Sequence, residues 1–311
     1  MLALLGFYVP FLGIFVTFLW PVPIAMIAVR HGMRTSVMTV VVAGAVLSMV
    51  VGLLEGALMT FVMGLVGLAL GYALLKRWNP VNTVLLATVA VVIGTVTSFS
   101  ISILFFDLNI SMMFEQMAEA ATRVAEIYER FGVSRDTLEP FTAVWTQAID
   151  LMRLILPAIL LVGGLVNAVL NYEVARRVMS RFGYNMQPLP GFAEWRFPSW
   201  AALGFIGGQV AAALYGAGAI ELFGRTLHLG HESLLLFNTA ANVAFASQFL
   251  LVVQGLSLAY HFLMRFRMPR GISVFILAWA WFNPTMSQII LMFGLMDAVF
   301  DYRRFGAAVK K

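Results

Sequence analysis

Long apolar runs are the feature that most restricts how this chain can fold. Runs of about 18 or more apolar residues recur along it, and each is long enough to cross a hydrocarbon core of roughly 30 Å as a helix. Of all residues, 61% are hydrophobic and 11% are charged, whereas a soluble domain carries about 25% charged residues. A water-soluble core could not bury this excess. The sequence therefore predicts an all-α, polytopic transmembrane helical bundle with about seven to nine membrane segments.

The predicted membrane segments follow from the positions of these runs. Pro10 and the cluster from Trp20 to Pro23 interrupt the first run, and Asn283-Pro284 interrupts the last, so both ends are predicted to hold broken segments. We expect a first span of about 18 residues and a short return towards Arg30. The further predicted spans are Thr35 to Gly52, Gly56 to Leu75, Val81 to Phe106, Leu151 to Val174, Ser199 to Leu222, Ser233 to Met264, and Gly271 to Phe300 as a hairpin or one kinked span.

Basic residues occupy alternate loops, and the positive-inside rule places those loops in the cytoplasm. The clusters are Arg30 with Arg34, Lys76 with Arg77, Arg176 to Arg181, and Arg265 to Arg270. The tail from Asp301 to Lys311 is basic as well, so both termini are expected in the cytoplasm. We expect a multi-pass membrane protein in three parts: an N-terminal transmembrane bundle (1–106), an external segment (107–150) and a C-terminal transmembrane bundle (151–311).

The external segment contains an amphipathic pattern. From Ser111 to Phe131, apolar residues recur every three or four positions, with charged residues on the other faces. This periodicity predicts an amphipathic helix that either rests on the membrane surface or docks a partner.

Catalytic and metal-binding patterns are absent from the sequence. There is no His-Glu-x-x-His motif, no Gly-x-Ser-x-Gly elbow and no phosphate-binding loop, and the chain has no cysteine. His228 and His231 are spaced for a shared metal, but a solvated loop pair explains them better. The basic residues flank apolar runs, which indicates topology and not nucleic-acid binding. We expect no enzyme activity, no cofactor and no metal.

Amide side chains inside predicted spans are the candidate ligand-binding residues. A neutral amide both donates and accepts hydrogen bonds, so it can hold a polar ligand or join two helices. Both alternatives stay open for the set as a whole. We interpret Glu55 as the acidic residue embedded between long apolar runs. One such residue gives little support to ion-coupled transport. The candidates are Asn167, Asn171, Gln209, Asn238 and Asn242, and we expect them to line one pocket.

Small residues repeat at four-residue spacing and predict close helix packing. Such a face serves either the interior of the bundle or the docking of another membrane protein. The faces include Gly44, Ser48 and Gly52 in the first half of the chain, and Gly204 and Gly208 in the second.

Several short motifs resemble the YybS-like family of uncharacterised bacterial polytopic membrane proteins. They are Pro21 to Pro23 with Arg30 to Gly32, Gly52 to Gly71 with Lys76-Arg77, Gln254 to Ser257, Phe293 to Asp297, and Asp301 to Arg304. The resemblance covers nearly the whole chain. That family is distantly similar to the S components of energy-coupling-factor transporters, which implies a bacterial inner membrane and small-molecule binding. S components have about six spans, and this chain is predicted to have more.

Two functions fit these observations. The first is binding or helping to translocate a small polar or amphipathic solute, as S components do, with a transporter's energising subunits as partners. The second is a scaffold or assembly partner of another membrane complex with no ligand of its own. A pocket lined by amides favours the first, and amides bonded from helix to helix favour the second.

Overall fold

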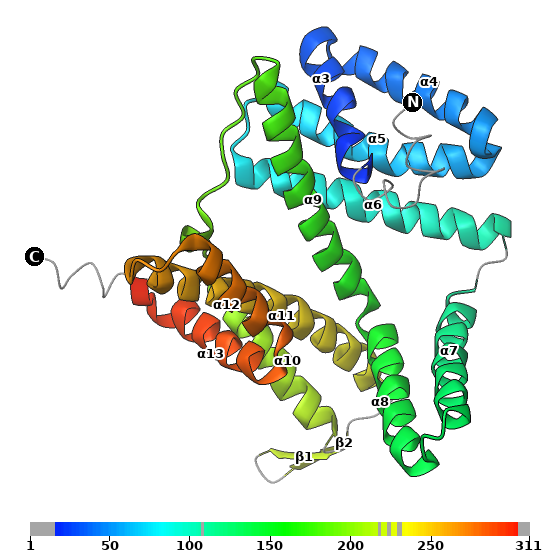
Figure 1. Ribbon diagram of the computed structural model, residues 1–311, viewed down its shortest axis with the longest axis vertical. Coiled ribbons are helices and arrows are strands. Elements are labelled where there is room, and N and C mark those ends of the chain that lie inside the picture. The colour runs from blue at the N-terminus through cyan, green and yellow to red at the C-terminus, as the bar shows by residue number, and fades with distance from the viewer. Residues whose placement is uncertain (1–15, 107–108, 217–218, 223–224, 229–231, 304–311) are drawn as a thin grey trace, which may run out of the picture. The chain divides into compact units, whose positions relative to one another are not determined.

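The computed structural model describes residues 16–106, 109–216, 219–222, 225–228 and 232–303 (Figure 1). Contacts divide the chain into two compact units. The first unit comprises residues 1–123 and 160–189, and the second comprises 124–159 and 190–311. This grouping differs from the expected division at 107 and 151, because residues after 160 pack with the N-terminal helices.

All regular secondary structure among the described residues of the first unit is helical. Its core joins the N-terminal helices to α9: Ala168 and Tyr172 lie in one buried cluster with Val22, Leu70 and Val84. Close contacts at glycines let the helices approach, since Gly71 of α5 lies against Ala28 of α3. Its helices are α3 (Pro21–His31), α4 (Met33–Val51), α5 (Leu53–Leu75), α6 (Pro80–Phe106), part of α7 (Ile110–Arg130) and most of α9 (Leu156–Arg181).

The second unit is centred on α11, a helix of 34 residues. Leu251 and Leu256 of α11 form a buried cluster with Phe205 of α10 and Leu291 of α13. The elements of this unit are the end of α7, α8 (Arg135–Leu154), the one-turn helix η1 (Phe192–Glu194), α10 (Trp200–Gly216), β1 (Ala219–Leu222), β2 (Arg225–His228), α11 (Glu232–Arg265), α12 (Arg270–Phe282) and α13 (Pro284–Phe300).

Five described helices are long and apolar enough to cross a membrane: α4, α5, α6, α9 and the part of α11 from Leu235 to Arg265. The bent pair α12–α13 makes a sixth if it counts as one span, and Val16–His31 and Trp200–Leu214 are shorter apolar helices. Large apolar side chains such as Met49 and Phe275 are exposed, as surfaces that meet lipid should be. The all-α transmembrane class is therefore confirmed.

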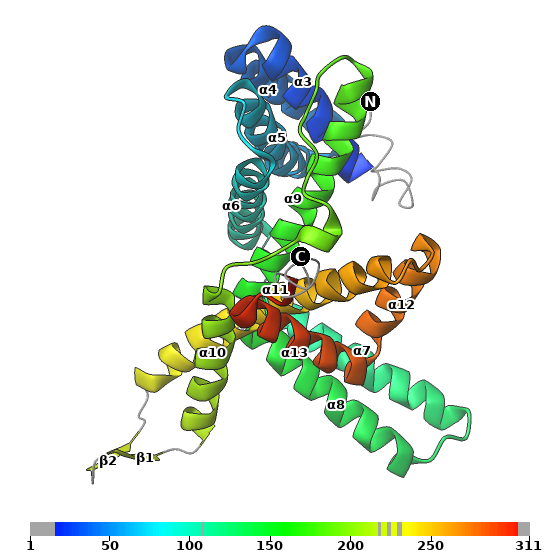
Figure 2. The same ribbon diagram turned by 90° about the vertical axis from the view of Figure 1, so that its left-hand side faces the viewer.

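The two predicted breaks differ in form. The first predicted span lies mostly outside the described residues. Pro21 occupies the first position of α3, where its missing N–H costs no hydrogen bond. At the other end, the pair α12–α13 is bent by 104°, and the two helices can be followed in Figure 2. Asn283 caps α13 by accepting a hydrogen bond from the Met286 amide at 3.1 Å. The break at Asn283-Pro284 is thus present, with an angle between a straight crossing and a full reversal.

The predicted span from Ser199 to Leu222 is wrong at its C-terminal end. Helix α10 ends at Gly216, and residues 219–222 form β1, which pairs antiparallel with β2. The last residue of α10 is Gly216, a residue type that disfavours helix by about 1 kcal/mol relative to alanine. His228 lies in β2, and His231 lies outside the described residues.

The amphipathic segment forms the predicted helix. α7 spans Ile110–Arg130, and Phe114 and Ala121 of its apolar face are buried, whereas Phe131 is exposed. A turn with Gly132 at φ 89° leads into α8. Two of the arginines in this region bind neighbouring carboxylates on the surface, Arg123 to Glu119 and Arg135 to Glu129.

Candidate functional site

Asn242 uses its whole amide group within the protein. Its Nδ2 donates to the Leu154 carbonyl at 2.9 Å and to the Asn238 carbonyl at 2.8 Å, and its Oδ1 accepts from the Ala158 amide at 2.8 Å. Leu154 ends α8 and Ala158 lies in the first turn of α9, so Asn242 joins α11 to the junction of these two helices.

The position of this amide follows from a proline. Pro157 has no N–H, and the chain turns at Ile155, where α8 ends. Residues 154 and 158 are four apart, the spacing at which an uninterrupted helix bonds C=O to N–H directly. The Asn242 side chain lies between this donor and this acceptor and satisfies both. It therefore acts as a helix-to-helix link.

Asn167 and Asn171 form a second pair, on α9 in the first unit. Nδ2 of Asn171 donates to the side-chain oxygen of Asn167 at 2.8 Å and to its carbonyl at 3.0 Å. Asn171 is fully buried, and its Oδ1 has no hydrogen-bond partner among the described residues. Gln209, on α10, is exposed.

A buried charge cluster, which we call the Arg303 cluster, consists of Gln254, Ser257, Asp297 and Arg303. The carboxylate of Asp297 accepts from Nε2 of Gln254 at 2.9 Å and lies 3.4 Å from the Arg303 guanidinium. Arg303 also donates to the Ser257 hydroxyl at 3.0 Å. The side chains of Asp297 and Arg303 are 1% and 5% exposed. Two opposite charges are thus held out of contact with solvent.

The Arg303 cluster also fixes the loop before α10. Arg303 donates to the carbonyls of Ala193 and Trp195, the latter at 3.1 Å, and Oε1 of Gln254 accepts from the Phe197 amide at 3.0 Å. Burial lowers the pKa of Arg303, and the negative charge of Asp297 opposes that shift. Within the described residues, Oδ1 of Asp297 and Nε of Arg303 have no hydrogen-bond partner.

Glycine contacts bring the members of this cluster together. Gly255 of α11 lies against the carbonyl of Ile290, and Gly294 of α13 lies against the carbonyl of Leu251. A Cβ at either glycine would collide with backbone, so α11 and α13 can approach this closely only without one. The approach places Gln254 beside Asp297.

Sequence reasoning missed Asp297 as an embedded acid. Glu55, the residue chosen for that role, is exposed, whereas Asp297 is buried. The available signal was the spacing of Gln254 and Ser257, which are three apart and share a helix face. Their partners lie elsewhere in the chain, and the spacing of two residues on one helix does not predict which distant residues they contact.

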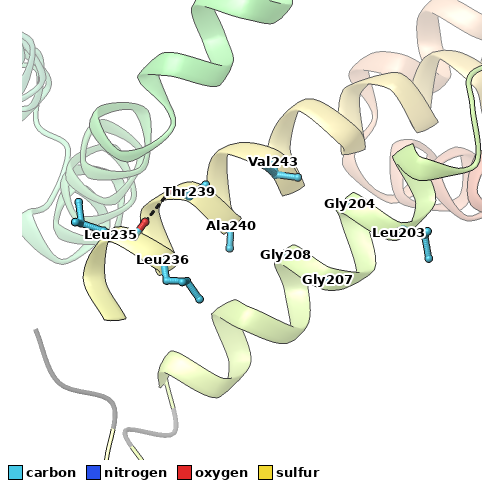
Figure 3. A pocket seen from close by; sticks show the side chains of 9 residues that line it. All are labelled: Leu203, Gly204, Gly207, Gly208, Leu235, Leu236, Thr239, Ala240 and Val243. Carbon is cyan, nitrogen blue, oxygen red and sulfur yellow. Dashed lines mark hydrogen bonds between the residues drawn. The ribbon is translucent and has the colours of Figure 1, made fainter. Parts of the chain in front are cut away.

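An apolar groove of about 420 Å³ lies between α10 and α11 (Figure 3). Gly204 and Gly208 of α10 lie against Ser247 and Ala244 of α11, and Gly207 has open space around it. Ala240 points towards the glycines of α10 (Figure 3). The groove is lined by Leu203, Gly204, Gly207, Gly208, Leu235, Leu236, Thr239, Ala240 and Val243.

None of the five predicted ligand-binding amides lines this groove. The Asn242 amide is directed at the α8–α9 junction, and ligand binding by these amides stays a prediction. Asn167 and Asn171 belong to the other unit. In the part of the chain that the structure describes, no three His, Cys, Asp or Glu residues are placed to hold a metal ion.

The small residues of the first unit also pack within it. Gly56 lies against the backbone of Ser48, and Gly44 lies beside Thr60. The hydroxyl of Ser48 donates to the Leu53 carbonyl at 2.9 Å across the turn at Gly52. These residues connect α4 to α5.

Comparison with known proteins agrees with the membrane architecture. The chain is 23% identical over 302 residues to "Uncharacterized protein YybS" of Bacillus subtilis (strain 168), covering 97% of this chain and 93% of that protein. No solved structure matches the chain significantly. These findings do not bear out the distant similarity to S components. The family model described as "Predicted membrane protein (DUF2232)" matches residues 1–298, and the chain belongs to that family.

Proposed function

We propose that this protein is a non-enzymatic scaffold or assembly subunit of the bacterial inner membrane, and that it receives a transmembrane helix of another membrane protein. The observation that carries this proposal is the bonding of Asn242. The donors and the acceptor of this amide already bind backbone groups of the same protein, so the amide is not available to a polar solute.

The groove between α10 and α11 is the proposed docking surface. Small residues at such a surface let a partner backbone approach closely, and the resulting van der Waals packing helps hold helices together in lipid. Leu203 and Leu236 are largely exposed at its rim, and Gly207 has no atom within 4 Å of where a Cβ would lie. A helix of similar small-residue character fits this surface.

Filling the groove tests this function. Gly207→Leu should occupy the groove without disturbing the fold, because the space at Gly207 is open. The matched control is Gly163→Leu, since Gly163 of α9 also has open space. The apparent mass of the complex extracted from native membranes in mild detergent is measured together with the melting temperature.

The expected result is a complex for the wild type and the control, and a free chain for Gly207→Leu, with similar melting temperatures for all three. A wild type that is extracted only as a free chain would refute the scaffold function. So would a Gly207→Leu variant that keeps its partner.

One observation favours a second candidate, binding of an amphipathic solute through its apolar part. The groove volume of about 420 Å³ lies within the range of small-molecule sites, roughly 300 to 1,000 Å³. A ligand that binds the folded state raises its stability. Thermal-shift screening against lipids, vitamins and nucleotides therefore tests this candidate, and a stabilising compound should lose its effect in Gly207→Leu.

A further inference from the structure

Two helix ends carry an arginine in the left-handed conformation. Arg77 follows α5 with φ 53°, and Arg267 follows α11 with φ 57°. In each turn the next amide donates back to the helix, from Trp78 to the Ala73 carbonyl at 2.9 Å and from Met268 to the Leu263 carbonyl at 3.1 Å. This is the six-to-one bond of a Schellman motif, and each arginine occupies the position where glycine is usual.

The same chain ends two other helices in this way with glycine. Gly132 follows α7 with φ 89°, and Gly183 follows α9 with φ 84°. The same back-bonds form there, from Val133 to Tyr128 and from Tyr184 to Met179, both at 3.1 Å. Glycine adopts this conformation without the steric cost that a Cβ brings. Arg77 and Arg267 adopt the same conformation despite the steric cost of a Cβ. Glycine would close the helix without that cost, so helix closure does not explain why arginine is present.

The arginine turns share a setting that the glycine turns lack. Each is a four-residue connection between two apolar helices, residues 76–79 between α5 and α6 and residues 266–269 between α11 and α12. Each exposes an apolar side chain directly after the arginine, Trp78 or Met268. Basic residues such as Lys76 and Arg265 accompany the arginine turns, but basic residues also precede the glycine turns, so the shared setting is the pair of apolar helices and the exposed apolar side chain.

Neither arginine has an acidic partner in the described part of the chain: no ion pair there involves Arg77 or Arg267. Both side chains are exposed. A guanidinium binds phosphate oxygens in a bidentate manner, and tryptophan favours the level of the headgroups. We propose that the Arg77 and Arg267 turns are two binding sites for the phosphate headgroups of anionic phospholipids.

The test compares the wild type with Arg77→Gly/Arg267→Gly in vesicles of phosphatidylcholine, with and without phosphatidylglycerol. Glycine keeps the turn and removes the charge. The matched control is Arg130→Gln/Arg181→Gln, which removes two exposed arginines from the last turns of the helices that end in glycine. The melting temperature and the enrichment of phosphatidylglycerol around the protein are measured.

In phosphatidylcholine alone, the glycine variant should melt at the wild-type temperature or above it, because the strain is relieved. Phosphatidylglycerol should stabilise the wild type and the control, and its affinity should fall about fivefold for each arginine turn that is changed. A glycine variant that keeps the full response to phosphatidylglycerol would overturn the proposal. Equal stabilisation by inorganic phosphate in phosphatidylcholine vesicles would show an anion site and would overturn the lipid assignment.

Discussion

Removing Arg303 should destabilise the second unit strongly. The change Arg303→Met keeps much of the buried side-chain volume but leaves the Asp297 carboxylate without its cation, and it leaves the carbonyls of Ala193 and Trp195 without this donor. Breaking a buried ion pair by removing one partner costs about 3 to 5 kcal/mol, because the remaining charge is desolvated and uncompensated.

The size of the effect can be checked by thermal unfolding of the detergent-purified protein. A loss of this size corresponds to a drop in melting temperature on the order of 10 °C for a unit of this length. Asp297→Asn in the Arg303→Met background should recover part of the loss, since it removes the uncompensated charge. The coupling between the two positions should be about 1 to 3 kcal/mol.

An exposed arginine provides the control. Arg34→Met removes a charge from the surface of α4 and should change stability by less than about 0.5 kcal/mol. If Arg303→Met melts like Arg34→Met, the Arg303 cluster does not hold the unit together. Failure of Asp297→Asn to recover any stability would show that the carbonyl contacts, and not the ion pair, matter.

Three further predictions concern other parts of the chain. Asn242→Ala should cost about 1 to 3 kcal/mol because a buried donor and acceptor lose their partner, whereas Gln209→Ala, at an exposed amide, should be near neutral in the same unfolding measurement. Gly294→Ala should lower the melting temperature by forcing α13 away from α11, and a wild-type melting curve would contradict the close approach. Single cysteines at Lys76 and Glu126 should react with an impermeant reagent from opposite sides of the membrane, and labelling from the same side would refute the topology.

The sequence alone determined the local elements. Apolar length predicted the long helices, because a segment that crosses lipid must satisfy its backbone within itself and cover that length with apolar side chains. The three- and four-residue periodicity predicted α7, and Pro284 predicted the break between α12 and α13. These are properties of neighbouring residues, which a single sequence contains.

Only the tertiary structure decided which polar groups meet. Asn242 contacts residues 84 and 88 positions away, and Gln254 contacts Asp297 at a separation of 43. Such pairs depend on where helices cross, and the crossing of α11 with α13 is set by glycines on both helices. An amide in a span predicts that some partner exists, because an unpaired polar group in lipid is costly. It does not say whether that partner is a ligand or, as for Asn242, the broken end of another helix.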